Sequence, residues 1–329
     1  MSLFAASTAV HVVLVAALLW TAFWVYVWIR YLPIVIRLIG EAPLLVAETS
    51  VPIAGGEDCE FRTSDGLTLR GSYFRTTAAE RRGVIIFGHE LNGDRWNAEP
   101  YVQELIPAGF DVLTFDFRNH GTSDAAPNTT LRPWITPADA ADMRAALDYV
   151  TARPDADPRG VGILGISRGA GSAICAVAGD PRVRCLFTDG AYPTHATHLI
   201  FLRRYIDIYI PYPWTMLTSR LPDWVYRAFL AAARWWWGRK NGYTFLKVES
   251  AARDLRVPVL MVHGGRDTMI PEAAAKALRK CISAPSKLWV VPAAKHNGAL
   301  AAEPVEYQRR LKRFFGLHLA RRRGDARRR

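Results

Sequence analysis

The first strong hydrophobic pattern in the chain is an uncharged run near its N-terminus. From Ala9 to Ile29 the sequence AVHVVLVAALLWTAFWVYVWI carries no formal charge, and a helix of this length covers the roughly 30 Å hydrocarbon core of a bilayer. A cleaved signal peptide has a basic start, a shorter apolar core and a small-residue cleavage site, which this run lacks. We therefore expect a single-pass, uncleaved membrane anchor within residues 1–45, with a signal peptide as the alternative.

Residues that flank the run predict its orientation. Arg30 and Arg37 follow it and no Lys or Arg precedes it, so the positive-inside rule predicts that the bulk of the chain lies in the cytoplasm. Aromatic residues crowd its downstream half, an arrangement typical of a membrane interface or of packing against a partner helix. They include Trp20, Trp24, Tyr26, Trp28 and Tyr31.

After residue 55 short apolar runs alternate with helix-like stretches. Segment 59–75 has a polar TSDG between two extended halves and predicts an antiparallel hairpin. Helix-like stretches of suitable length follow, such as 136–153 and 271–282. This alternation predicts an α/β fold with a doubly wound, mostly parallel sheet. Six runs are nearly continuous in hydrophobic residues, as strands covered on both faces are: 83–89, 111–117, 160–166, 184–190, 258–265 and 287–292.

One connection is much longer than the others. About 67 residues, from Ala191 to Val257, separate two consecutive strands, and so long a connection is expected to carry its own structure. Its sequence is helix-like and rich in aromatic residues. We expect a helical cap at about 192–256 over the active edge of the sheet, inside an α/β domain that spans 57–316 and is followed by a basic tail at 317–329.

Composition and charge exclude several classes of protein. The 329 residues are 50% hydrophobic and 22% charged, which is typical of a globular protein. The net charge of +12 is concentrated at the end of the chain, where Arg309 to Arg329 hold ten basic residues and one Asp. A terminal run of this kind favours a solvated tail, or one drawn to anionic lipid, over a nucleic-acid surface. The four cysteines form no CxxC pair, so we expect no disulfide framework, metal site or cofactor.

The candidate chemistry centres on Ser167. It lies in Gly165-Ile166-Ser167-Arg168-Gly169, directly after a predicted strand and before a predicted helix. Small flanking residues permit the sharp turn that exposes a nucleophilic serine. Asp267 and His296 follow the next two suitable strands, so the chain supplies a nucleophile, an orienting carboxylate and a base in the order Ser, Asp, His. The backbone N–H of Arg168 is one expected oxyanion donor.

These features resemble the α/β-hydrolase superfamily, in its capped serine-hydrolase branch of esterases, lipases and serine aminopeptidases. The resemblance covers about residues 57–316. The HG-x-x-G loop of the family is matched by HELNG from His89, with Glu90 where Gly is usual, and its D-x-R-x-H-G-x-S stretch is matched by DFRNHGTS at 116–123. The resemblance implies that the backbone N–H of Leu91 is the second oxyanion donor. Glu90 is either a residue near the substrate or a surface residue paired with an arginine.

Other polar residues have simpler interpretations. Arg118 and His120 are expected to brace loops beside the site, as the family pattern implies. Asp139 and Asp142 are expected to be charges near a helix N-terminus, which the helix dipole favours. His195 and His198 have a spacing that could hold a metal, but no further ligands lie nearby in sequence, so a structural role is expected.

The aromatic cap predicts a hydrophobic substrate. Trp235 and Trp236 of the cap, with His89 and Glu90 of the loop, are the expected substrate-binding residues; packing of these aromatics into a small core within the cap is the alternative. We expect hydrolysis of a small hydrophobic or lipid-like carboxylic ester through an acyl-enzyme, by a protein attached to the membrane through its N-terminal helix. Thioesterase or serine peptidase chemistry with the same triad, and a non-catalytic membrane-anchored binding module, are the alternatives. The sequence leaves the oligomeric state open.

Overall fold

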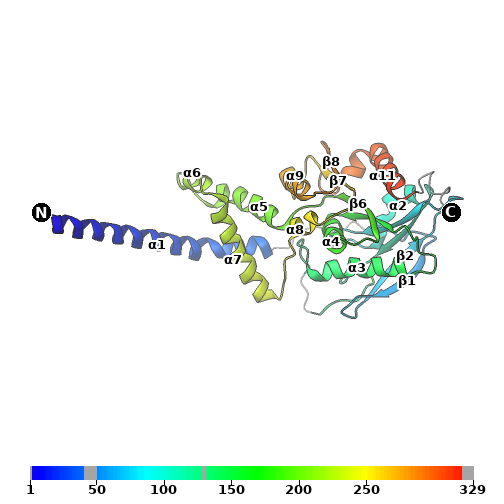
Figure 1. Cartoon of the computed structure of the whole chain (residues 1–329), viewed down its shortest axis with the longest axis horizontal. Coiled ribbons are helices and arrows are strands. Elements are labelled where there is room, and N and C mark those ends of the chain that lie inside the picture. Colours follow the sequence, from blue (N-terminus) through cyan, green and yellow to red (C-terminus); the bar gives the residue numbers. More distant parts are fainter. Residues whose placement is uncertain (1, 41–49, 128–130, 321–329) are drawn as a thin grey trace. The chain divides into compact units, whose positions relative to one another are not determined.

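The computed structural model describes residues 2–40, 50–127 and 131–320. They form helices and an eight-stranded sheet (Figure 1). The chain divides into two compact units, which are described separately. The larger unit comprises Ala42–Ile200 and Thr244–Arg329, and the smaller comprises Met1–Glu41 and Phe201–Tyr243.

The sheet confirms the predicted fold class. Its strand order is β1-β2-β4-β3-β5-β6-β7-β8. β2 is antiparallel to β1 and β4, and all other neighbours are parallel. The hairpin expected at 59–75 and the six expected runs all form strands of this sheet. The strands are β1 (Glu57–Arg62), β2 (Thr68–Phe74), β3 (Gly83–Gly88), β4 (Phe110–Phe115), β5 (Val161–Ile166), β6 (Val183–Asp189), β7 (Val259–Gly264) and β8 (Ser286–Val291).

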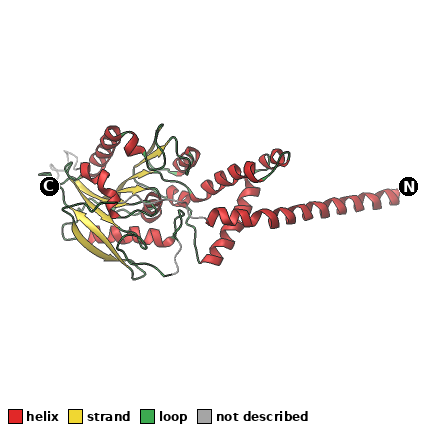
Figure 2. Cartoon of the chain, turned by 180° about the vertical axis from the view of Figure 1, so that it is seen from behind, coloured by secondary structure: helices red, strands yellow, loops and turns green. Residues whose placement is uncertain are grey.

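Helices cover both faces of the sheet (Figure 2). Successive residues of a strand point to opposite faces, so Val84 and Ile86 of β3 pack on one core while Ile85 and Phe87 pack on the other. The first core also contains residues of α3 (Pro137–Ala152), α4 (Arg168–Val177), α8 (Val248–Arg253) and α9 (Glu272–Cys281). The second contains residues of η1 (Arg95–Ala98), α2 (Glu99–Leu105), α10 (Ala299–Ala302) and α11 (Pro304–Leu319).

The boundaries of the larger unit differ in detail from those expected. α11 extends to Leu319, which is buried in the second core, so 317–319 belong to this helix and not to the basic tail; residues 321–329 lie outside the described residues. Both ends of the expected cap segment, 192–200 and 244–256, belong to the larger unit, and Val248 and Ala252 are part of its first core.

The smaller unit consists of helices. It contains α1 (Ser2–Gly40), the later part of α5 (Thr194–Tyr209), α6 (Trp214–Ser219) and α7 (Asp223–Asn241). α1 packs along α7, with the rings of Trp28 and Phe229 4.8 Å apart. α7 ends at Gly242, whose φ of 61° is favourable for a residue without a side chain.

The N-terminal helix has the length and composition of a membrane span. Val10–Gly40 has a mean hydropathy of 2.2 in its most apolar window, and none of that window is buried. Leu18 and Ile29, for example, are 70% and 73% exposed. α1 is therefore a candidate anchor, as expected from the sequence, and a signal sequence has the same features.

Candidate active site

Ser167 lies in a strained turn between β5 and α4. Its φ of 49° and ψ of −111° are outside the regions that residues with side chains ordinarily occupy. The turn requires glycine at positions 165 and 169, because neither position has space for a Cβ. A Cβ on Gly165 would lie 2.6 Å from the Ala170 Cα, and one on Gly169 would lie 2.2 Å from the Gly88 carbonyl oxygen. The turn is thus fixed by close backbone packing.

The structure brings Ser167, Asp267 and His296 together. The Ser167 Oγ is 2.8 Å from His296 Nε2, and His296 Nδ1 is 2.6 Å from an Asp267 carboxylate oxygen. A carboxylate only accepts hydrogen bonds, so Nδ1 carries the proton and Nε2 is free to accept the hydroxyl proton of Ser167. This is the geometry that a nucleophile, a base and an orienting acid require.

Asp267 is fixed on the loop after β7. Its other carboxylate oxygen accepts hydrogen bonds from the backbone N–H groups of Met269 (2.9 Å) and Ile270 (2.8 Å). The imidazole of His263, on β7, is bonded to the Ile270 carbonyl at 2.9 Å, and burial lowers the pKa of this histidine. These contacts hold the carboxylate in the orientation in which it meets His296.

The loop after β3 lies against the nucleophile turn. The close approach of Gly169 to the carbonyl oxygens of Gly88 and His89 places the beginning of α4 beside this loop. Arg168 is the first residue of α4, so its backbone N–H has no acceptor within the helix. Leu91 is buried in the loop. The expected oxyanion donors thus come from two segments that pack together; their roles remain predictions.

His89 has a structural role in this loop. Its Nε2 accepts a hydrogen bond from the Phe117 N–H at 3.1 Å, so its Nδ1 donates to the Glu90 carbonyl oxygen at 2.7 Å. Burial lowers its pKa to about 4, so the ring is neutral near pH 7. Glu90 is not among the non-glycine residues with positive φ in the described chain, so the loop accepts a side chain there. Substrate contact by His89 and Glu90 remains a prediction.

Buried arginine pairs brace the site as expected for Arg118. This side chain donates to the buried carboxylate of Asp142 and to Asp65. Arg168 pairs with Asp139, which also accepts the backbone N–H of Thr136 and so caps α3. Asp139 and Asp142 therefore do more than interact with the helix dipole, because each binds an arginine of a neighbouring loop or helix.

His120 and His198 are likewise enclosed. His120 Nε2 accepts a hydrogen bond from the Asn92 N–H at 3.3 Å, which links the two loops of the family pattern. His198 packs on Trp134, with ring centroids 4.0 Å apart. Within residues 2–40, 50–127 and 131–320, no group of three or more His, Cys, Asp or Glu side chains has the arrangement of a metal site.

Asp189 is a buried carboxylate that the sequence reasoning did not single out. It ends β6, and its carbonyl oxygen accepts the Ser167 N–H at 2.7 Å. Among the described residues no donor reaches its carboxylate with normal hydrogen-bond geometry, although the Tyr307 hydroxyl of α11 interacts with it and lowers its pKa, an effect smaller than that of burial. Burial raises its pKa to about 6. The available signal was an acidic residue at the carboxyl end of a predicted parallel strand, where sites of this fold class gather.

Trp235 and Trp236 are exposed on α7, at 65% and 43% respectively. Lys240 lies over the Trp236 ring, 5.2 Å from its centroid. The neighbouring Trp237 is the buried member of the run and packs on Tyr243. Trp235 and Trp236 therefore do not form a core within the cap, and their contact with substrate remains a prediction.

The chain belongs to the α/β-hydrolase family. Residues 85–308, more than half of the chain, match the model of the Alpha/beta hydrolase family. This agrees with the sheet order, the strained serine turn and the motifs from which the resemblance was recognised.

Similar proteins include several hydrolases. An uncharacterised protein of Mycobacterium tuberculosis is 27% identical over 256 residues, which cover 77% of this chain and 76% of that protein. A thiohydrolase of Aspergillus aculeatus is 32% identical over 133 residues, 40% of each chain. An esterase of Pyrococcus furiosus has a TM-score of 0.61 at 20% identity, over 85% of this chain and 100% of the esterase; this likeness concerns the fold.

Proposed function

We propose that this protein is a membrane-anchored serine hydrolase that cleaves carboxylic esters with a hydrophobic or lipid-like acyl group. The observation that carries the proposal is the hydrogen-bonded series Ser167, His296 and Asp267, built on a turn that only glycine neighbours allow. A binding module has no need for three such residues brought from separate loops.

The reaction proceeds through an acyl-enzyme. The Ser167 Oγ attacks the carbonyl carbon of the ester while its proton passes to His296 Nε2, and Asp267 stabilises the resulting imidazolium. The N–H groups of Arg168 and Leu91 stabilise the negative charge on the carbonyl oxygen. The carbon–oxygen bond to the leaving alcohol then breaks, and the alcohol departs with the proton held by His296.

Water completes the cycle. His296 removes a proton from a water molecule, whose oxygen attacks the acyl carbon of the Ser167 ester. The carbon–oxygen bond to Ser167 breaks, the serine regains its proton from His296, and a carboxylic acid is released. In both steps each proton passes to or from His296, so the acid and the base of the reaction belong to the chain.

Substitution of the serine tests the proposal. Full-length protein in detergent micelles is assayed on p-nitrophenyl esters of increasing chain length. We expect Ser167→Ala to lower turnover by about a thousandfold or more, because the nucleophile is removed. Ser172→Ala is the matched control: Ser172 lies in α4 and its hydroxyl bonds only the Arg168 carbonyl in the hydrogen bonds described, so this variant is expected to keep the parent rate.

Assays on three classes of substrate distinguish the related activities. Acyl-CoA thioesters and aminoacyl amides are assayed beside the esters, since one of the relatives is named a thiohydrolase. Preference for long-chain esters supports the proposal. Faster turnover of thioesters or amides would replace ester hydrolysis by that activity, and no turnover of any substrate would favour the binding module.

A further inference from the structure

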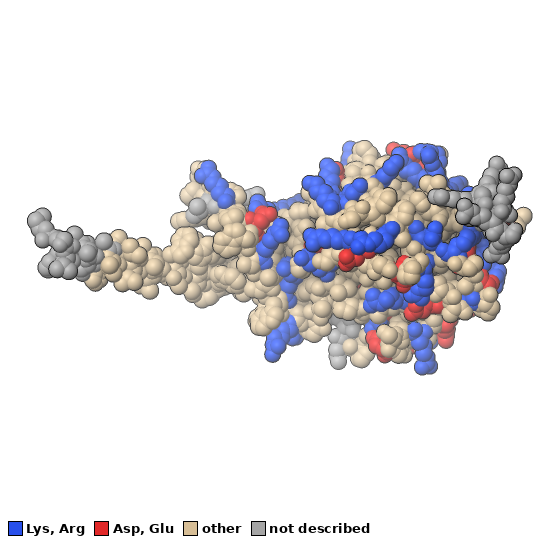
Figure 3. All heavy atoms as spheres, in the orientation of Figure 1, with Lys and Arg blue, Asp and Glu red and all other residues tan. Residues whose placement is uncertain are grey.

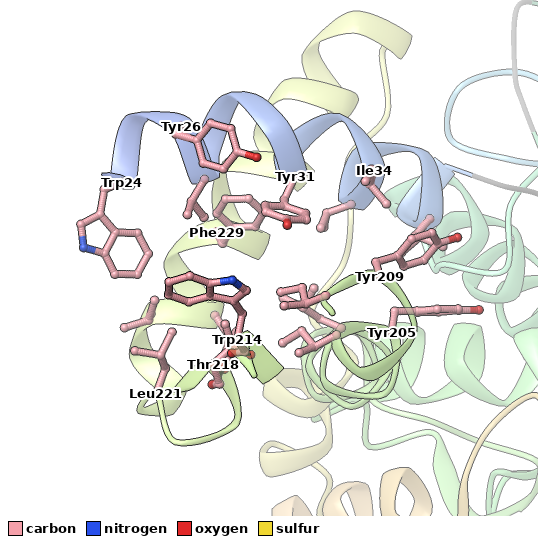
Figure 4. A pocket seen from close by; sticks show the side chains of 18 of the residues that line it. Trp24, Tyr26, Tyr31, Ile34, Tyr205, Tyr209, Trp214, Thr218, Leu221 and Phe229 are labelled. Atoms are coloured by element: carbon pink, nitrogen blue, oxygen red, sulfur yellow. Dashed lines mark hydrogen bonds between the residues drawn. The ribbon is translucent and has the colours of Figure 1, made fainter. Parts of the chain in front are cut away.

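A cavity of about 500 Å³ lies within the smaller unit, between α1 and the helices α5 to α7 (Figure 4). This volume is typical of sites that bind small molecules. Val35 of α1, Ile206 of α5 and Phe229 of α7 line it and are buried. The cavity belongs to one unit, and its walls come from helices that pack on each other.

The walls present mainly hydrocarbon, and the Tyr31 hydroxyl and the Trp214 indole N–H are polar groups beside the cavity (Figure 4). None of the described residues that line the cavity is charged. The Thr218 hydroxyl bonds the Trp214 carbonyl at 3.1 Å, and the Tyr226 hydroxyl bonds the Thr218 carbonyl, so both are satisfied within the wall. The hydroxyl groups of Tyr205 and Tyr209 point away from Trp214 (Figure 4). An apolar ligand loses no hydrogen bonds in such a space, whereas a polar group would find few partners.

One wall is continuous with the apolar surface of the candidate anchor. α1 exposes hydrophobic side chains from Val10 to Ile29. This stretch contains no Lys, Arg, Asp or Glu, and Figure 3 shows none on the face of it that is in view. The residues that line the cavity begin at Phe23. If α1 lies in a bilayer, the cavity is at the end of the span, where lipid chains meet their headgroups.

The charges of the smaller unit are complementary to an anionic headgroup. Segments 2–40 and 201–243 contain nine basic residues and two acidic ones. Basic side chains next to a membrane attract anionic lipid. Exposed aromatic residues occur on the same helices, including Trp214 (57% exposed) and Trp224 (70%), as is common at the membrane interface.

We infer that this cavity binds one acyl chain of an anionic phospholipid, with the headgroup outside among the basic residues. The inference rests on the membrane attachment in the proposed function, but not on catalysis by Ser167. The occupant is a bilayer lipid and not a second copy of the chain, because the cavity is bounded by helices of one chain and adjoins the apolar surface of α1.

Photolabelling tests the inference. Full-length Ser167→Ala protein, which cannot consume an ester, is placed in phosphatidylcholine vesicles that contain phosphatidylglycerol with a diazirine in its acyl chain. After irradiation, the labelled peptides are identified by mass spectrometry. We expect labels on residues that line the cavity, such as Val35, Ile206 and Phe229. Phosphatidylcholine and free fatty acid with the same diazirine chain are the comparison probes, and weaker labelling by both is expected.

Two isoleucines of α5 provide matched variants. Ile206 lines the cavity and is 8% exposed, whereas Ile208 is 66% exposed and is not a lining residue. Ile206→Trp fills the cavity with a larger side chain and is expected to lower cavity labelling by about tenfold. Ile208→Trp is expected to leave it unchanged. Both substitutions are also made in protein that retains Ser167. Labelling of that serine by a fluorophosphonate then reports that the larger unit is folded.

Each outcome decides the question. Labels spread only along Val10–Ala22, which lies outside the lining residues, or equal labelling of the Ile206→Trp and Ile208→Trp variants, would show that the cavity does not hold a lipid chain. Cross-linked dimers at the lining residues would identify a second copy as the occupant, and stronger labelling by free fatty acid would identify a different ligand. Parent protein that retains Ser167 and labels in the cavity, but reacts with no fluorophosphonate, would contradict the proposed function alone.

Discussion

At the scale of single residues, the meeting of Ser167, His296 and Asp267 was predictable and the surroundings of these side chains were not. Ser167, Asp267 and His296 follow strands in an order that a parallel sheet brings together, so the strand pattern was sufficient. Asp189 is likewise at the carboxyl end of a strand, but the sequence does not show which polar groups lie around a carboxylate. Its burial depends on packing by segments distant in sequence, such as α11, which contributes Tyr307 to the same core as β6.

The burial of Asp189 predicts how stability depends on pH. Its pKa is raised from 3.8 to about 6 in the folded chain, so between these values the folded state binds more protons than the unfolded state and stability falls as pH rises. Above pH 6 the full cost of the buried charge, up to about 3 kcal/mol, is present. Asp189→Asn removes this cost, and its stability relative to the parent is expected to rise between pH 4 and 6.

Chemical unfolding at pH 4 and pH 7 measures this effect. Asp58→Asn is the matched control, because the Asp58 side chain is 84% exposed and its charge stays in water. If the free energies of unfolding of the parent and of Asp189→Asn differ by the same amount at both pH values, the assignment of a buried, destabilising charge is contradicted.

At the scale of elements, periodicity was more informative than composition. The strand predicted at 111–117 is observed at Phe110–Phe115. Its continuous apolar run is typical of a strand in a sheet that is covered on both faces. In α7 the aromatic content alone did not tell which rings are buried. The buried side chains follow a helical spacing that includes Trp237 and leaves Trp235 and Trp236 exposed. These side chains are Tyr226, Phe229, Leu230, Ala233 and Trp237.

The membrane role of α1 is tested by charged substitutions. Full-length protein is expected to remain in the membrane fraction after alkaline carbonate extraction, and its intact mass is expected to include α1. Val15→Lys with Leu18→Lys is expected to release the protein, since each charge costs about 3 kcal/mol in the bilayer core. Val305→Lys with Leu317→Lys, at exposed positions on α11, is the control. A mature chain without α1 would identify a signal sequence instead.

At the scale of the whole molecule, one unit contains the sheet and the candidate active site, and the other contains the candidate lipid contacts. The larger unit holds the sheet, the triad and both cores. The smaller unit holds α1, the cavity and the exposed tryptophans of α7. The family pattern in the sequence describes only the first of these, which is why the motifs indicate how a bond is cleaved and the substrate must be inferred from the helices.

The most direct test of the account is to identify the residue that a fluorophosphonate modifies in the full-length protein. The proposed function has His296 and Asp267 activate Ser167, so the intact mass is expected to increase by one adduct, and peptide mass spectrometry is expected to place it on Ser167. An adduct on another residue, or no adduct in protein that hydrolyses esters, would contradict the assignment of Ser167 as the nucleophile.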